Sequence, residues 1–248
     1  MTEPRPTLGL LGSGEFLPWA EEVDSLLIES AGSRTDRVLV IPAASAPEGR
    51  VVFDRWAEMG REHYRRMGAA PEVLPLRTSE DTSRPEVVDR IEGAALVFFS
   101  GGNPAYLAGV LRGSPFLETL LDAVRAGETS LGGCSAGASV LGVRVPDPRK
   151  REVTEEIWSD GIGLLPAMIS AHWDTLDRWA PGIRTFVLDS VPDGLPHLAL
   201  EEQTAAVGDG HTFRVIGEGG VVLHRRDEED ARFTPGESFS LVEGSSQS

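Results

Sequence analysis

The sequence predicts an α/β fold, a three-layer sandwich with a mostly parallel central sheet and an antiparallel C-terminal extension. Three observations support this prediction. Short apolar runs alternate with helix-like stretches over the first two-thirds of the chain, glycine turns follow several of the runs, and short alternating stretches begin near Leu195. Short buried strands separated by helices are typical of a parallel sheet that helices cover on both faces.

Each expected element rests on a local pattern. Continuous apolar runs predict buried strands at residues 7–11, 37–41, 73–76, 94–99 and 129–131. Helical spacing of apolar residues predicts helices at residues 17–30, 51–67, 85–91, 105–111 and 116–126. A further buried strand is expected at residues 161–171. Strands joined by tight turns, forming an antiparallel extension of the same sheet, are expected at residues 195–200, 204–207, 213–216 and 220–223.

Length and charge limit the classes of protein that fit. We expect one domain over residues 1–243 and a disordered tail at 244–248, because 248 residues suffice for one large core. The net charge of −16 argues against nucleic acid and anionic membrane as partners. The N-terminus lacks a signal-peptide pattern, no apolar run approaches the roughly 18 residues of a membrane span, and the single cysteine excludes an intrachain disulfide. These features predict a cytoplasmic protein.

The most informative motif is G-x-S-x-G, formed by Gly133, Ser135 and Gly137 between a predicted strand and a helix-like stretch. A serine in a tight strand-to-helix turn projects its hydroxyl from the edge of the sheet, beside the free N–H groups of the new helix. By contrast, the turn at residues 12–14 lacks the third glycine of a dinucleotide fingerprint. Without a P-loop or a His/Cys cluster at metal spacing, no cofactor and no metal are expected.

A serine nucleophile needs a base, and the chain has five histidines. His63 lies in an arginine-rich helix and is expected to be solvated, and surface positions suit His211 and His224. His197 fits a core or strand-end position. His172 ends a buried-looking strand and begins a helix-like segment, so it is placed to meet a serine on a neighbouring turn. From spacing alone, a purely structural strand-end role for His172 stays open.

Three segments, in the same order, resemble the signature blocks of peptidase family S51, which contains dipeptidase E and cyanophycinase. They are GGNP at residues 101–104, GCSAGA at 133–138, and GIGLLP at 161–166 followed by His172. The stretch LEEQTA at 200–205 resembles another recurring family segment. The resemblance implies a flavodoxin-like fold similar to class I glutamine amidotransferases.

The resemblance also implies roles for individual residues. Ser135 would attack the scissile carbonyl, and His172 would take the serine proton and pass it to the leaving amine. The backbone N–H groups of Gly102 and Ala136 would bind the oxyanion, each with about 3 kcal/mol of transition-state stabilisation. Asn103 would shape the turn or contact substrate.

The acidic partner of His172 is the weakest element of the resemblance. The family-like position falls near residues 149–150, which are both basic. A small gap relative to the family pattern would shift the role of acidic partner to a nearby residue. Glu152 is the predicted partner of His172. Other acidic residues in the same stretch stay open: Asp147, Glu155 and Glu156.

Cys134 is a rival nucleophile, because amidotransferases of this fold use cysteine at the elbow. It lies one position out of register with the flanking glycines, so we expect a small apolar filler beneath the turn. This argues against glutamine amidotransfer. Specificity for acidic side chains is not carried over either, because Asn103-Pro104 replaces the Asp-Gln of cyanophycinase-like enzymes and the Asn-Thr of dipeptidase E.

The predicted function is a serine-type peptidase that hydrolyses short peptides or isopeptides through a Ser-His-acid acyl-enzyme mechanism, with a small peptide as substrate. One alternative is a catalytically silent amidotransferase-like domain that binds a small ligand or partner, and another is an esterase for small acyl groups. An apolar helix face would allow a homodimer.

Overall fold

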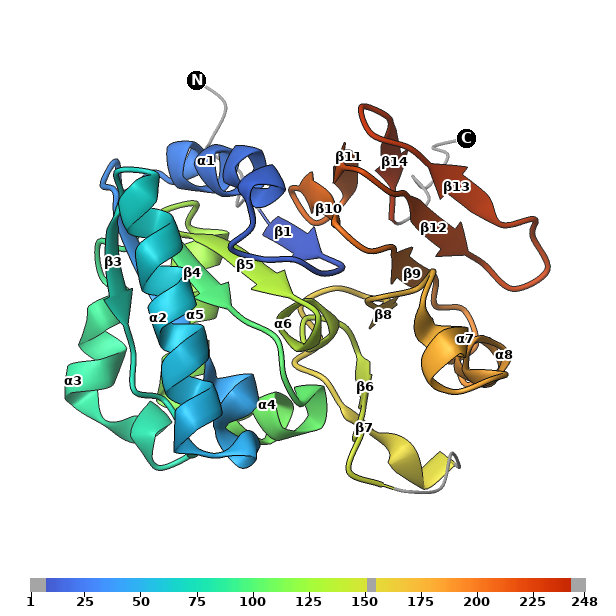
Figure 1. The fold of residues 1–248 in the computed structure, drawn as a ribbon, viewed down its shortest axis with the longest axis horizontal. Coiled ribbons are helices and arrows are strands. Elements are labelled where there is room, and N and C mark those ends of the chain that lie inside the picture. Colours follow the sequence, from blue (N-terminus) through green and yellow to red (C-terminus); the bar gives the residue numbers. More distant parts are fainter. Residues whose placement is uncertain (1–7, 151–154, 242–248) are drawn as a thin grey trace.

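The computed structural model describes residues 8–150 and 155–241 (Figure 1). A central eight-stranded sheet has the order β14-β11-β10-β1-β5-β4-β2-β3. Its parallel part consists of β1 (Leu8–Leu11), β2 (Arg37–Ile41), β3 (Ala70–Val73), β4 (Leu96–Phe99) and β5 (Ser130–Cys134). Three antiparallel strands follow on one side of β1, namely β10 (Thr204–Gly208), β11 (Thr212–Gly217) and β14 (Ser238–Ser240). The predicted α/β class with its antiparallel extension is confirmed.

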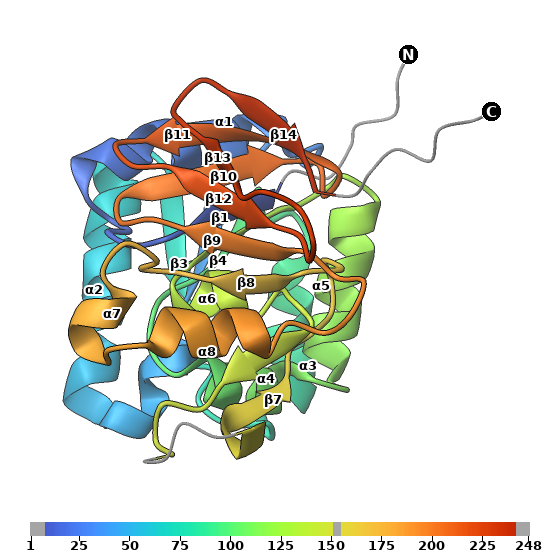
Figure 2. The same cartoon turned by 90° about the vertical axis from the view of Figure 1, so that its right-hand side faces the viewer.

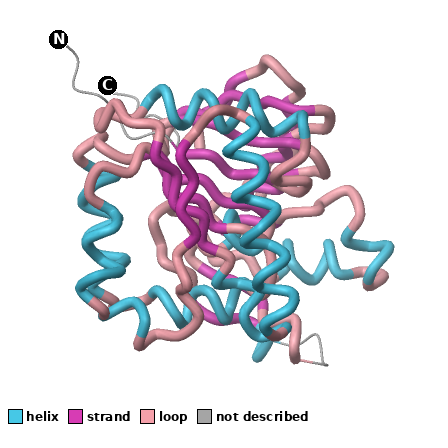
Figure 3. The backbone as a smooth tube through the Cα atoms, turned by 60° about the vertical axis from the view of Figure 1, so that its left-hand side comes forward, coloured by secondary structure: helices cyan, strands magenta, loops and turns pink. Residues whose placement is uncertain are grey.

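Helices cover both faces of the parallel part, which gives the predicted three layers (Figure 3). The helices α1 (Glu21–Ser30) and α2 (Arg50–Arg66) lie on one face. The other face is covered by α3 (Pro85–Val88), α4 (Pro104–Leu111) and α5 (Pro115–Arg125). Successive side chains of β4 alternate between the two cores, as the pleat of a strand requires: Leu96 and Phe98 pack on the first face, and Val97 and Phe99 on the second.

A second sheet has four strands in the order β13-β12-β9-β8 (Figure 2). They are β8 (Met168–Ser170), β9 (His197–Leu200), β12 (Val221–His224) and β13 (Ala231–Phe233). The expectation that residues 195–200 and 220–223 extend the central sheet is therefore wrong. Both faces of β9 are buried, with Leu198 in the main core and Ala199 in a separate cluster around Trp173. A strand buried on both faces has the same apolar pattern in either sheet, so the pattern could not distinguish them.

Two predicted strands are shorter or displaced. Only Met168–Ser170 of the run at 161–171 is a strand, because Gly163 adopts a φ of 67° and Pro166 lacks an N–H donor. The strand expected at 73–76 is Ala70–Val73 instead, since Pro75 cannot continue the ladder.

The remaining elements surround the carboxyl end of β5. They are α6 (Ala136–Ser139), β6 (Arg144–Pro146), β7 (Trp158–Asp160), α7 (Leu176–Trp179) and α8 (Ile183–Asp189). Short 3₁₀ helices occur at Pro18–Ala20, Ala43–Glu48, Asp81–Ser83, Asp89–Ile91 and Glu155–Ile157. Among the described residues, no helix combines the length and apolar character needed to cross a membrane. The tail predicted at 244–248 lies outside the described residues.

Candidate active site

Ser135 occupies the turn between β5 and α6, with a φ of 53° and a ψ of −110°. Such a conformation is costly for a residue other than glycine and is typical of a nucleophile elbow. A Cβ on Gly133 would lie 2.2 Å from the carbonyl oxygen of Gly137, and a Cβ on Gly137 would lie 2.1 Å from that of Phe99. Both glycines of the motif are therefore required by close backbone approach.

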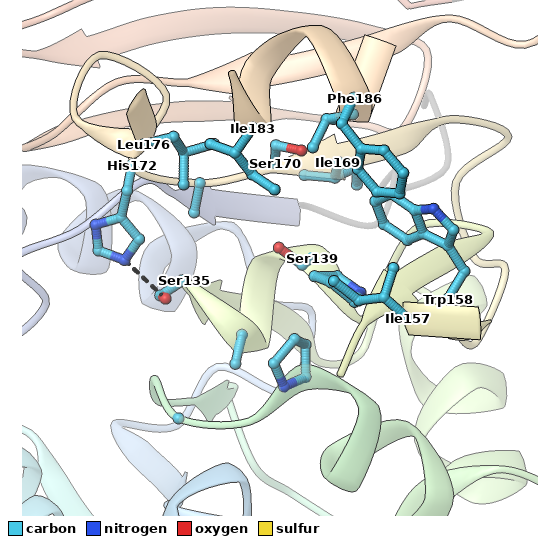
Figure 4. A pocket seen from close by; sticks show the side chains of 16 residues that line it. Ser135, Ser139, Ile157, Trp158, Ile169, Ser170, His172, Leu176, Ile183 and Phe186 are labelled. Atoms are coloured by element: carbon cyan, nitrogen blue, oxygen red, sulfur yellow. Dashed lines mark hydrogen bonds between the residues drawn. The ribbon is translucent and has the colours of Figure 1, made fainter. Parts of the chain in front are cut away.

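The side chains of Ser135, His172 and Glu202 form one hydrogen-bonded chain. The distance from Ser135 Oγ to His172 Nε2 is 2.9 Å (Figure 4). The distance from His172 Nδ1 to Glu202 Oε1 is 2.6 Å. The Thr175 hydroxyl donates to the same Glu202 oxygen at 3.3 Å. Nucleophile, base and carboxylate thus stand in the order that a catalytic triad requires.

The charge of Glu202 determines which nitrogen of His172 carries the proton. Partial burial acts to raise the pKa of the Glu202 carboxyl, but hydrogen bonds with Ser13 and His172 outweigh it and hold that pKa below its usual value. The ionised carboxylate only accepts hydrogen bonds, so Nδ1–H of His172 donates to it. Nε2 is then free to accept the proton of Ser135.

Different sheets supply these three residues. Ser135 follows the central strand β5, whereas His172 follows β8 of the second sheet. Glu202 lies in the turn that leads from β9 of the second sheet to β10 of the central sheet. Two hydrogen bonds of 2.9 Å hold this turn in place. Glu202 N–H donates to Asp174 Oδ1, and Gln203 N–H donates to Ser13 Oγ.

The predicted acid, Glu152, lies outside the described residues, and the Nδ1 proton of His172 is already donated to Glu202. Asp147 faces Arg149 instead, with Arg149 Nη2 2.7 Å from Asp147 Oδ2, and this contact holds the pKa of its carboxyl well below the usual range. The side chain of Glu156 is exposed, and that of Glu155 is not described. Among the described residues, the carboxylate that contacts His172 is therefore Glu202, a residue that sequence reasoning missed.

A signal for Glu202 was present in the chain. It belongs to the block at 200–205 that resembles a recurring family segment, and it is a polar turn between two apolar strands. Such a turn ends a strand at the same edge as Ser135. The resemblance of this block by itself implies no role for its carboxylates.

Gly102 and Ala136 are the residues whose backbone N–H groups are predicted to bind the oxyanion. Both residues line the cavity beside Ser135. Within the described parts of the chain, neither of their amides donates a hydrogen bond. Gly102 has a φ of 141°, and a Cβ there would lie 2.4 Å from the backbone carbonyl of Ala44, so only glycine fits. The preceding amide, Gly101 N–H, donates to the buried Glu15 carboxylate at 2.9 Å, which fixes the turn.

Asn103 has a local structural role. Its Oδ1 accepts from Tyr106 N–H at 2.9 Å and caps α4, and its Nδ2 donates to Asp147 Oδ1 at 3.2 Å. The side chain is buried, and Asn103 is not among the residues lining the cavity. A contact between Asn103 and substrate stays a prediction.

Cys134 is fully buried and packs in the core on the α1 and α2 side of the sheet. Burial raises the pKa of its thiol well above the usual value, which removes the reactive thiolate. The expected filler role agrees with this position.

The burial of the other histidines differs in part from the expectation. His63 is buried and lies 2.7 Å from Asp24, so the solvated position predicted for it is wrong. His224 is also buried, which corrects its predicted surface position, whereas His211 is exposed as expected. His197 is fully buried in β9, and its Nε2 lies 2.9 Å from Ser170 Oγ.

A cavity of about 150 Å³ opens directly beside Ser135 and His172. Figure 4 shows it between the Ser135 turn on one side and the rings of Trp158 and Phe186 on the other. No group of three or more His, Cys, Asp or Glu side chains that could hold a metal ion occurs within residues 8–150 and 155–241.

Comparisons with known proteins agree on one family. The model of peptidase family S51 matches residues 8–216. The cyanophycinase of Nostoc sp. PCC 7120 is 28% identical over 86% of this chain and 72% of its own length, and that of Geminocystis herdmanii is 27% identical over 88% and 80%. The crystal structure of a peptidase from an acI-B1 Actinobacterium matches with a TM-score of 0.86 and 32% identity, covering 95% of this chain and 97% of that one. A putative peptidase E from Listeria monocytogenes, with a TM-score of 0.57, 19% identity and coverage of 89% and 98%, shares the fold.

Proposed function

Because the chain belongs to peptidase family S51, we propose that it is a serine peptidase that cleaves short peptides through an acyl-enzyme. The proposed triad is Ser135, His172 and Glu202, with Glu202 in the role that the sequence suggested for Glu152. The observation that carries this proposal is the continuous hydrogen-bonded chain from Ser135 Oγ through His172 to Glu202, with distances of 2.9 and 2.6 Å.

In the first step, Ser135 Oγ attacks the scissile carbonyl carbon while its proton moves to His172 Nε2. The Glu202 carboxylate stabilises the imidazolium and holds the ring in the required tautomer. The carbonyl oxygen becomes an oxyanion, and the amide N–H groups of Gly102 and Ala136 are the proposed donors to it.

In the second half of the step, the tetrahedral intermediate collapses and His172 gives its proton to the leaving amine. A water molecule then enters, His172 takes a proton from it, and the resulting hydroxide attacks the acyl carbon. As the ester bond to Ser135 breaks, His172 returns the proton to Ser135 Oγ and the acid product leaves. The substrate therefore gains one water across the broken amide bond, and the protein returns to its starting protonation state.

The alternative of a catalytically silent ligand-binding domain has less support. A silent domain has no need to hold Ser135 at a φ of 53°, a conformation that costs of order 1–3 kcal/mol. Nor does it need an accepting imidazole nitrogen within 2.9 Å of that hydroxyl. No observation in the structure favours an esterase over a peptidase.

A fluorophosphonate probe tests the proposal directly, since it reacts only with activated serines. We expect labelling of the wild type and of Ser139→Ala, a matched control because Ser139 also lines the cavity. We expect no labelling of Ser135→Ala and at least a hundredfold slower labelling of His172→Ala. A folded wild type that neither reacts with the probe nor cleaves any dipeptide would refute the proposal.

A further inference from the structure

Building on the proposed function, we propose that the cavity beside Ser135 selects a large, uncharged apolar side chain next to the scissile bond. The charged side chains of an acidic or basic peptide are excluded from it. The proposal rests on the composition of the cavity wall, on the pairing of the nearest charges, and on the cavity's size.

The wall is almost entirely apolar. Its side chains come from the β6–β7 region, from β8, and from the helices α7 and α8 (Figure 4). They include Pro146, Ile157, Trp158, Ile169, Ile183 and Phe186. Apart from His172, no ionisable side chain of the described residues lines the cavity. Removing apolar substrate surface from water here is favourable.

The far end of the cavity is lined by two stacked aromatic rings. The rings of Trp158 and Phe186 lie 6.0 Å apart with an angle of 6° between their planes. The guanidinium of Arg144 lies 5.5 Å from the Trp158 ring centroid, which helps to fix the ring from outside the cavity. A preformed surface of this kind suits an aromatic or branched aliphatic side chain.

Charged side chains next to the cavity wall are already engaged. Asp147, which follows the lining residue Pro146, pairs with Arg149. Arg184, in the helix α8 that lines the cavity, lies over the ring of Trp173 with its Cζ 4.7 Å from the ring centroid. A substrate carboxylate or guanidinium would lose its hydration in the cavity and find no opposite charge among the described residues there, so its binding is strongly disfavoured.

Besides the catalytic pair, the polar groups of the wall side chains are the hydroxyls of Ser139 and Ser170 and the indole N–H of Trp158. The Ser170 hydroxyl lies 2.9 Å from Nε2 of His197. Burial and the nearby His224 lower the pKa of His197 to about 3, so its imidazole brings no charge to the cavity at neutral pH. Hydroxyls can bind a polar atom but cannot neutralise an ion.

The volume sets the size of the side chain. An apolar cavity of about 150 Å³ is large enough to bind benzene, and this cavity has about the same volume. A leucine, methionine or phenylalanine side chain therefore fills it, whereas alanine leaves most of it empty.

The first experiment measures binding without turnover. Dipeptides that vary one position at a time among Leu, Phe, Ala, Asp and Arg are titrated into Ser135→Ala by calorimetry. At one of the two positions we expect Leu and Phe to bind at least about tenfold more tightly than Ala, Asp or Arg. Binding of Asp or Arg peptides as tightly as Leu peptides would overturn the inference.

The second experiment changes the wall. Phe186→Arg introduces a cation, and we expect the ratio of kcat/KM for Asp over Leu peptides to rise at least about tenfold. Val51→Arg is the matched control, because Val51 is an exposed apolar residue on α2, outside the cavity. An unchanged ratio in a folded Phe186→Arg protein would overturn the inference. If that variant does not fold, Phe186→Ala must lower the preference for Phe over Ala peptides.

The two experiments distinguish a failure of the proposed selectivity of the cavity from a failure of the proposed peptidase activity. If Ser135→Ala prefers apolar peptides but the wild type cleaves none of them, the peptidase proposal is refuted and the selectivity of the cavity stands. If the wild type cleaves charged peptides faster than apolar ones, the selectivity is refuted and the peptidase proposal stands.

Discussion

Among the histidine–carboxylate contacts of the described residues, two have almost the same distance but lie in very different regions. In the candidate active site, His172 Nδ1 lies 2.6 Å from Glu202. Between the helices α1 and α2, His63 Nε2 lies 2.7 Å from Asp24. The two pairs differ in exposure, since the side chains are 22% and 34% exposed in the first pair and 1% and 1% in the second.

The second nitrogen of each ring shows what the pair does. The free nitrogen of His172 faces the Ser135 hydroxyl beside a cavity. The other nitrogen of His63 lies 3.0 Å from Arg66 Nη2, on the same helix. The Asp24 carboxylate also accepts from the Tyr64 hydroxyl at 3.0 Å.

The comparison teaches that a histidine–carboxylate contact is not in itself a mark of catalysis. At His63 both ring nitrogens are engaged, one with Asp24 of α1 and one with Arg66 of α2, so the pair stabilises the fold. At His172 one nitrogen faces the proposed nucleophile, Ser135, beside a cavity. The predictions below test this division, first at the proposed catalytic pair and then at the structural one.

The largest expected effect is at Glu202. We expect Glu202→Gln to lower kcat on the order of 10³- to 10⁴-fold, because the neutral amide no longer fixes the tautomer or stabilises the imidazolium. Steady-state turnover of a Leu- or Phe-containing dipeptide measures this. The change in the free energy of unfolding is expected to be small by comparison.

Glu152→Gln and Asp147→Asn serve as controls for that variant. Both should retain kcat within about threefold of the wild type, since neither side chain is the partner of His172 in the proposed triad. A larger loss of kcat in Glu152→Gln than in Glu202→Gln would contradict the proposed triad and support Glu152, the acid predicted from the sequence.

For the buried pair of His63 and Asp24, we expect a substitution to change stability rather than turnover. We expect His63→Ala to lower the free energy of unfolding by about 3–5 kcal/mol, because it leaves the buried Asp24 carboxylate with the Tyr64 hydroxyl as its remaining partner. Urea denaturation measures the loss. Below the unfolding transition, kcat should stay near that of the wild type, and a folded His63→Ala protein without turnover would contradict the division between the two pairs.

His197 offers a third case, a buried histidine without a carboxylate. Burial and His224 lower the pKa of His197 from 6.5 to about 3, so the unfolded chain binds a proton between these values that the folded protein does not. Stability should therefore fall as the pH falls from about 6.5 to 3, by at most roughly 1.4 kcal/mol per pH unit from this group.

The variant His197→Gln isolates that contribution. Its urea midpoint should fall less steeply with acidification than that of the wild type, while the exposed His211→Gln should keep the wild-type slope. Equal slopes in all three proteins would show that His197 is not the group responsible.

The same comparison explains how much could be predicted from the sequence. Ser135 and His172 could be predicted because each follows an apolar run, and polar residues at the carboxyl ends of buried strands commonly line ligand sites. Glu202 was missed because its proximity to His172 depends on how β9 passes from the second sheet to the central sheet. That path depends on contacts between distant segments, which no local pattern records.

The wrong prediction of a solvated position for His63 has a different cause, the local composition of its helix. Its neighbours Arg61, Arg65 and Arg66 made the stretch look solvated, but a helix has two faces, and the face with His63 and Tyr64 is buried against α1. Composition over a window averages the two faces. The buried partner Asp24 lies 39 positions earlier in the chain, beyond the reach of any local pattern.

The division of the proposed triad between two sheets has a consequence for folding kinetics. A refolding chain that has formed the central sheet already possesses the Ser135 turn, but it lacks its base and its acid until β8 and β9 dock. Recovery of activity should therefore lag behind recovery of secondary structure after dilution from denaturant. The rate at which turnover recovers would then report the docking of β8 and β9, rather than the formation of the Ser135 turn.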